Sequence, residues 1–115
     1  VSNAAYSKLT VKKVPAFMSQ DIVTKLLREE LGFDGIVMTS PLNDNVIENN
    51  YTNEFAVVEA VKAGCDLIVL PGNFKECYEA LITAVEEGRI DEKVINTSVR
   101  RILQNKIQRG ILVLE

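Results

Sequence analysis

The chain has 115 residues, of which 47% are hydrophobic and 25% charged, and this is the composition of a globular protein rather than of a disordered or collagen-like chain. Its net charge is −3 and its 13 basic residues are scattered, which argues against nucleic acid as a partner. No apolar run approaches the ~20 residues of a membrane helix, so we expect no membrane segment. The chain contains no histidine, which excludes a histidine-based triad and histidine-ligated zinc within it.

The first predicted elements are a helix over residues 19–31 and a strand over 35–39. Ser19 is suited to cap the helix, Asp21 places a carboxylate in its first turn, and Gly32 ends it. The apolar positions of this helix fall on one face: Ile22, Val23, Leu26, Leu27 and Leu31. The strand is apolar without alternation, which is typical of a strand covered on both faces in a parallel sheet. We predict a polar loop over residues 40–53.

The same pattern then repeats. A helix is predicted over residues 54–63 and is closed by Gly64, and a second buried strand over 67–70 is stopped by Pro71–Gly72. Ile36 and Leu67 are 67 − 36 = 31 positions apart, the length of a strand–helix–strand crossover, so the two strands are predicted to pair in parallel.

Two further helices complete the chain. Asn73 and Glu76 form a capping-box variant for a helix that runs to Glu87, and Asp91 caps the last helix. That last helix carries an apolar stripe at Val94, Ile95, Val99, Ile102, Leu103 and Ile107. A two-stranded parallel sheet has two open edges, so we expect the chain either to be part of a longer protein or to complete its sheet with copies of itself. The abrupt start at Val1 favours the first alternative.

The two cysteines, Cys65 and Cys77, are too few for a disulfide scaffold, and their spacing is not that of a metal or redox pair. We expect both to be buried free thiols that behave as small hydrophobic side chains. No glycine-rich phosphate loop opens a helix. We therefore expect no metal and no other cofactor.

Several segments carry a family resemblance. Val14–Ser19 followed by Leu26–Thr39 resembles the pattern P-A-S-x-S … L-R-E-E-L-G-F-D-G-V-V-x-T-D of the glycoside hydrolase family 3 catalytic domain, in its β-N-acetylhexosaminidase branch. Ala60–Ile68 resembles the family's A-x-x-A-G-x-D-x-L segment, and Ser98–Leu103 resembles its closing S-V-R-R-I-L helix. Ser2–Tyr6 is similar to a segment usually read as S-H-x-x-Y-P.

The resemblance implies an α/β fold in which residues 1–115 form one partial domain, the C-terminal part of a (β/α)₈ barrel, with two parallel strands and about four helices. Members of the family hydrolyse β-linked sugars with retention, using a carboxylate nucleophile and a separate proton donor. The nucleophile is the aspartate of the T-D pair, and this position holds Ser40 here. Asn3 stands where relatives often have a substrate-binding histidine. The family's proton donor is a histidine upstream of this segment.

Other polar residues have simpler interpretations. Asp44 offers a carboxylate four positions after Ser40, where a misplacement of one ångström already costs catalysis heavily. Asp34 and Asp66 precede the two strands and are interpreted as structural. Arg28–Glu29–Glu30 is interpreted as a solvated helix face with local ion pairs.

The sequence therefore predicts a fragment of a retaining glycosidase for β-linked N-acetylglucosaminides, inactive as an isolated chain because Ser40 replaces the nucleophile and no proton donor is present. Carbohydrate is the expected partner of the full-length parent, and self-association is expected for the fragment. The parent would be a cytoplasmic or exported bacterial protein. A non-catalytic descendant that binds a glycan or a protein, and a self-assembling partial barrel, remain as alternatives.

Overall fold

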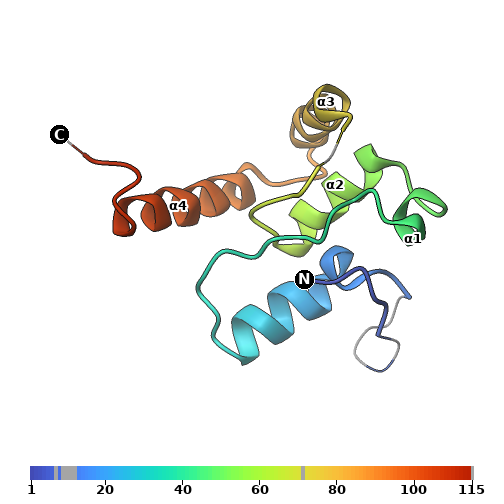
Figure 1. Ribbon diagram of the computed structural model, residues 1–115, viewed down its shortest axis with the longest axis horizontal. Helices are drawn as coiled ribbons and strands as arrows, with labels where there is room; N and C mark the ends of the chain where they lie inside the picture. The colour runs from blue at the N-terminus through green and yellow to red at the C-terminus, as the bar shows by residue number, and fades with distance from the viewer. Residues whose placement is uncertain (7, 9–12, 71, 115) are drawn as a thin grey trace.

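The computed structural model describes residues 1–6, 8, 13–70 and 72–114, and its regular elements are helical (Figure 1). No continuous strand forms within these residues, where extended segments meet at two isolated bridges instead. The elements in chain order are the 3₁₀-helix η1 (Ala16–Met18), the π-helix η2 (Asp21–Glu30), α1 (Asn45–Glu48), α2 (Asn53–Ala63), α3 (Phe74–Glu86) and α4 (Glu92–Gln108).

The two predicted strands are reduced to a single parallel bridge between Met38 and Leu67. The Leu67 N–H donates to the Val37 carbonyl at 3.1 Å, and the Thr39 N–H donates to the Leu67 carbonyl at 3.0 Å. The next bonds of a parallel ladder would run from the Val69 N–H to the Thr39 carbonyl and then from the N–H of residue 41 to the Val69 carbonyl, but residue 41 is a proline and has no N–H to donate. The prediction of two full strands is therefore not confirmed for the described residues, and Pro41 removes one of the bonds that would extend them.

Side-chain and displaced backbone bonds replace the missing rung. The Val69 N–H donates to the Thr39 hydroxyl oxygen, and the Leu42 N–H donates to the Val69 carbonyl, each at 3.2 Å. On the other side of this segment, the Val1 ammonium group donates to the Met38 carbonyl at 2.7 Å and the Ser40 N–H to the Val1 carbonyl at 3.0 Å. Three extended segments thus lie side by side. Pro71, the predicted stop of the second strand, lies outside the described residues.

The core is built around α2, which lies between η2 on one side and α3 on the other (Figure 1). Most of the length of α2 is buried, and its alanines and valines let its neighbours approach closely. Both cysteines are buried and free, as predicted. Burial raises the pKa of the Cys65 thiol to about 12 and also raises that of Cys77, so neither is a reactive thiolate at neutral pH. The largest fully buried side chains are Phe17, Leu42, Ile47, Val23 and Val57.

The helix ends match the sequence predictions in some places and not in others. Asp91 caps α4 as predicted, since its carboxylate accepts the Lys93 N–H at 2.9 Å. The predicted capping box of α3 is wrong, because Asn73 adopts a left-handed conformation (φ 53°) and its side chain makes no capping bond. The predicted loop 40–53 contains the short helix α1, capped by Asp44.

The apolar stripe of α4 has the predicted periodicity, but much of it is not buried against this chain. Val94 and Ile95 are half-buried, whereas Val99 and Leu103 are 46% and 42% exposed. Figure 1 shows α4 extending away from the body formed by η2, α2 and α3. Among the described residues, no helix is both long and apolar enough to cross a membrane.

A side chain at Gly64 is expected to destabilise the fold. It closes α2 with a φ of +110°, and an added Cβ would lie 2.8 Å from Thr24 Oγ1 and 3.3 Å from Val23 Cγ1. We expect Gly64→Ala to lower the free energy of unfolding by about 3 kcal/mol, from left-handed strain plus the clash. Gly88→Ala is the matched control, because its φ is +73° with no atom within 4 Å. It should cost only about 1–2 kcal/mol in the same urea titration. Equal losses would contradict the clash.

Candidate functional site

Ser40, the predicted counterpart of the family nucleophile, directly follows the bridged segment at its carboxyl end. The residue is half-buried, so it is neither enclosed in the core nor fully in solvent. Its hydroxyl donates to the Val1 carbonyl at 3.2 Å. The hydroxyl proton is thus held by a backbone carbonyl rather than by a base, and a neutral hydroxyl in this arrangement is not an activated nucleophile.

Asn3, the second predicted site residue, is also half-buried and lies two residues beyond the Val1 segment that pairs with Ser40. Its side-chain carbonyl oxygen, Oδ1, is buried and has no hydrogen-bond partner within the described part of the chain. A buried amide oxygen without a donor is costly. A hydrogen-bond donor placed against this oxygen would satisfy it.

Asp44 is already engaged in a structural role. It is exposed, and one oxygen of its carboxylate accepts the Val46 N–H at 2.9 Å at the start of α1. A capping carboxylate is held by the helix it caps. Asp44 is the only one of the three candidate residues with a carboxylate. It follows Ser40 by four positions, and its carboxylate caps α1.

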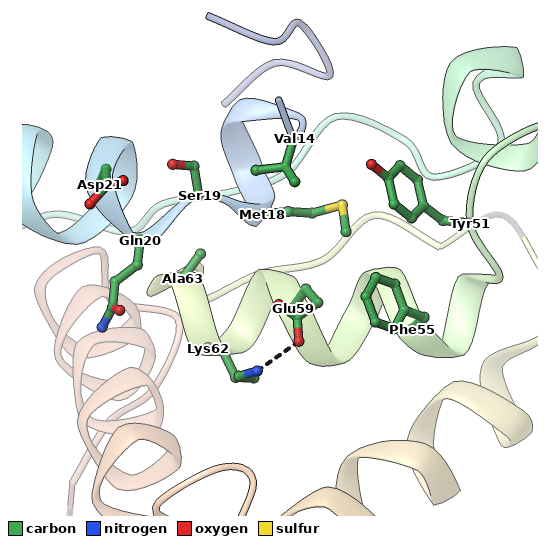
Figure 2. A pocket seen from close by; sticks show the side chains of 10 residues that line it. All are labelled: Val14, Met18, Ser19, Gln20, Asp21, Tyr51, Phe55, Glu59, Lys62 and Ala63. Atoms are coloured by element: carbon green, nitrogen blue, oxygen red, sulfur yellow. Dashed lines mark hydrogen bonds and ion pairs between the residues drawn. The ribbon is translucent and has the colours of Figure 1, made fainter. Parts of the chain in front are cut away.

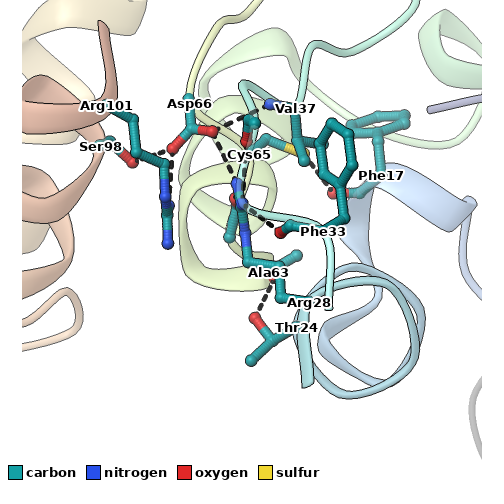
Figure 3. Close-up of polar contacts among 12 residues, drawn as sticks. Phe17, Thr24, Arg28, Phe33, Val37, Ala63, Cys65, Asp66, Ser98 and Arg101 are labelled. Carbon is teal, nitrogen blue, oxygen red and sulfur yellow. Dashed lines mark hydrogen bonds and ion pairs between the residues drawn. The ribbon is translucent and has the colours of Figure 1, made fainter. Parts of the chain in front are cut away.

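A second polar cluster centres on Asp66, whose carboxylate is completely buried (Figure 3). One oxygen pairs with Arg28 Nη2 at 2.6 Å and accepts the Val37 N–H at 2.9 Å. The other accepts the Ser98 hydroxyl at 2.7 Å and Arg101 Nη1 at 3.0 Å. This single carboxylate therefore joins η2, the bridged segment and α4.

Burial alone would raise the pKa of Asp66, but this effect is outweighed. Hydrogen bonds from the Val37 N–H, Ser98 and Arg101, together with the charge of Arg28, hold the pKa of the carboxyl below its usual value. Asp66 precedes Leu67 at the amino end of its segment, whereas Ser40 follows the neighbouring segment at its carboxyl end. In parallel α/β folds the carboxyl ends carry the chemistry, so Asp66 is structural, as the sequence indicated.

The interpretation of Arg28 as part of a solvated face is wrong. Only 10% of its side chain is exposed, and besides Asp66 its guanidinium donates to the carbonyls of Gly35 and Gly64, each at 3.0 Å. Glu29 and Glu30 do face solvent. Sequence reasoning also missed Ser98 and Arg101 as partners of Asp66. The residues themselves lie in two motifs that the sequence shows, L-R-E-E and S-V-R-R. The sequence did not show that the fold brings these two motifs together.

A hollow of about 420 Å³ lies elsewhere, between the η1–η2 region and α2 (Figure 2). Its apolar wall includes the stacked rings of Tyr51 and Phe55, whose centroids are 5.8 Å apart. Its polar side includes the ion pair between Lys62 and Glu59, at 2.8 Å. Ser40 and Asn3 do not line it, so this hollow is not the site that the sequence predicted.

The two segments of the parallel bridge are connected by α1 and α2, and polar side chains follow the first segment. A helical connection between parallel segments is typical of a parallel α/β protein. Residues 1–105 match the model of the Glycosyl hydrolase family 3 N terminal domain, and the chain belongs to this family. In solved relatives this domain is a TIM-barrel-type fold.

Individual relatives agree with this assignment. The chain is 37% identical over 82 residues to a β-glucosidase of Rhizobium radiobacter, and 30% identical over 101 residues to β-hexosaminidase A of Pseudoalteromonas piscicida. These matches cover 71% and 80% of this chain but only 9% and 17% of those proteins. A family 3 β-N-acetylglucosaminidase structure from Paenibacillus superposes with a TM-score of 0.84 at 37% identity, over 93% of this chain and 22% of that one.

Proposed function

We propose that this chain is the nucleophile-bearing segment of a family 3 glycosidase domain in which Ser40 occupies the nucleophile position, so that the chain itself does not cleave glycosides. The observation that carries the proposal is the place of Ser40, half-buried at the carboxyl end of the bridged segment. In barrel enzymes this end of the strands holds the catalytic groups. A complete parent of this segment is a glycoside hydrolase.

The proposed substrate class of the parent is a β-linked N-acetylglucosaminide. The L-R-E-E-L-G-F-D-G segment resembles that of the hexosaminidase branch, and the relatives include β-hexosaminidase A and the Paenibacillus β-N-acetylglucosaminidase. A β-glucoside is the second candidate, supported by the 37% identity to the Rhizobium radiobacter β-glucosidase. Carbohydrate is the proposed partner in both cases, and Oδ1 of Asn3, which has no hydrogen-bond partner among the described residues, is the proposed contact to it.

The proposed inactivity follows from the chemistry of retention. The attacking group must be ionised and must leave again, as a carboxylate does. The Ser40 hydroxyl is neutral and donates to a backbone carbonyl. The chain has no histidine to act as the family's proton donor.

The direct test is an assay of this chain with fluorogenic β-N-acetylglucosaminide and β-glucoside substrates. We expect no hydrolysis above the buffer rate for the chain or for Ser40→Ala. Hydrolysis that disappears in Ser40→Ala would overturn the proposal, because the serine would then be a working nucleophile. Hydrolysis that is unchanged in Ser40→Ala and lost in Asp44→Ala would assign the role to Asp44.

We also propose that the chain self-associates through the apolar face of α4. Sedimentation velocity at micromolar concentration is expected to show species heavier than the 12.8 kDa monomer, because burial of the exposed stripe is favourable. Leu103→Glu should shift the distribution toward monomer. Gln104→Glu, which adds the same charge on an exposed neighbour, should not. A compact monomer for the unmodified chain would refute the proposal.

A further inference from the structure

A groove of about 230 Å³ lies between η2 and α4, away from Ser40 and Asn3. Gly64 forms part of its wall, η2 contributes Thr24 and Arg28, and α4 contributes Lys93, Thr97 and Arg101. The glycine allows the close approach of η2 here, because a Cβ at residue 64 would lie 2.8 Å from the Thr24 hydroxyl oxygen. The groove is therefore formed by the same close packing that brings Arg28 to Asp66.

The charges around this groove do not balance. Arg28, Lys93 and Arg101 line it, and only the two arginines pair with a carboxylate, that of Asp66, so three positive charges are set against one negative charge. Both oxygens of Asp66 are already occupied by four donors. Lys93 is exposed and forms no ion pair with any described residue. The excess of two positive charges is thus left for a ligand.

Arg28 supplies an independent observation. Its side chain is nine-tenths buried, and its two Nη atoms donate to Asp66 and to the carbonyls of Phe33, Gly35 and Gly64. Its Nε atom is buried as well, but has no acceptor among the described residues. Gly64 has no side chain, and a Cβ built at this residue would lie 3.9 Å from the Arg28 Nε. A buried N–H donor normally has an acceptor, so Arg28 Nε lacks an oxygen at this point.

From these two observations we infer that the groove between η2 and α4 binds an oxyanion of the phosphate type. Guanidinium groups pair with such an anion through planar, directed N–H donors, and an ammonium group adds a point charge. Arg101 uses Nη1 for Asp66, and Lys93 lines the groove and is exposed to solvent. The anion would accept from Lys93, from the remaining N–H groups of Arg101 and, with a small adjustment of the side chain, from Arg28 Nε.

The site is tested by titrating the chain with inorganic phosphate at constant ionic strength, with chloride as the balancing anion. Two readouts are calorimetry and the ¹⁵N–¹H signal of the arginine Nε groups. We expect saturable binding and a phosphate-dependent shift of the Arg28 Nε–H signal. Lys93→Gln should weaken binding about tenfold, since it removes one of three cations. Lys75→Gln is the matched control, because Lys75 is exposed on α3 and does not line the groove.

Two results would overturn the inference: no signal change beyond that in chloride, or the same affinity for Lys93→Gln and Lys75→Gln. Circular dichroism of both variants ensures that a loss of binding is not a loss of folding. A parallel titration with glucose 6-phosphate identifies the source of the phosphate group. Tighter binding of the ester supports a phosphate carried on a larger molecule, and equal or weaker binding supports free phosphate.

Discussion

Ser40→Asp is expected to restore glycosidase activity once this segment stands in a complete barrel. The host is the Paenibacillus β-N-acetylglucosaminidase, whose corresponding part is 37% identical and covers 22% of that chain. With Ser40 the chimera should fall on the order of 10⁴-fold or more in kcat, the scale of losing a covalent nucleophile. With Ser40→Asp, a carboxylate returns at the end of the bridged segment, and we expect most of that loss to be recovered.

Ser40→Asn is the matched control for this exchange, because it has nearly the shape of aspartate but no charge. It should remain as inactive as the Ser40 chimera. A Ser40→Asp chimera that folds, as judged by its melting transition, and still shows no turnover would contradict the assignment of residue 40. Asp44→Asn added to the Ser40→Asp chimera should leave kcat within a few-fold, because Asp44 caps α1 and is not expected to attack the sugar.

Asp66→Asn is expected to have the largest effect on stability. The substitution removes the one charge that neutralises Arg28, whose side chain is 10% exposed, and Arg101, whose side chain is 26% exposed. The asparagine side chain would also point its own N–H groups at hydrogen-bond donors, which cannot accept them. Removing one partner of a buried ion pair costs about 3–5 kcal/mol. Since domains are stable by only about 5–15 kcal/mol, urea unfolding should show that the variant has lost a large part of its free energy of unfolding.

Asp34→Asn is the control for this substitution, because Asp34 is exposed and precedes the other bridged segment. It should change the free energy of unfolding by no more than about 0.5 kcal/mol. A stable Asp66→Asn variant would show that the cluster in Figure 3 does not hold η2 and α4 in place.

The same carboxylate makes stability depend on pH. The pKa of Asp66 is lower in the folded chain than its ordinary value, so its stabilising contribution is complete above about pH 4, the pKa of an unfolded aspartate. That contribution is lost as the pH falls below this value toward the folded pKa. Urea titrations between pH 7 and pH 2.5 should show the loss in the unmodified chain and in Asp34→Asn alike.

The sequence by itself determined the order and approximate limits of the main helices. Apolar spacing, glycines such as Gly64 and the Asp91 cap are local features, and each acts through bonds within a few residues of itself. The motifs also identified the family, which the match over residues 1–105 bears out. The sequence also predicted which segments pair in parallel, because the apolar segments around Ile36 and Leu67 are the ones that meet.

Only the tertiary structure decided how far the two segments pair and which charged side chains become buried. The ladder stops after one bridge, because the Val69 N–H donates to the Thr39 hydroxyl oxygen and Pro41 has no N–H for the bond that would follow. Arg28 has the pattern of a solvated residue within its own helix, yet it is buried because Asp66, 38 positions away, needs a counter-charge. Long-range partners of this kind are set by topology, and neither helical periodicity nor a motif of ten residues encodes which charge will face which.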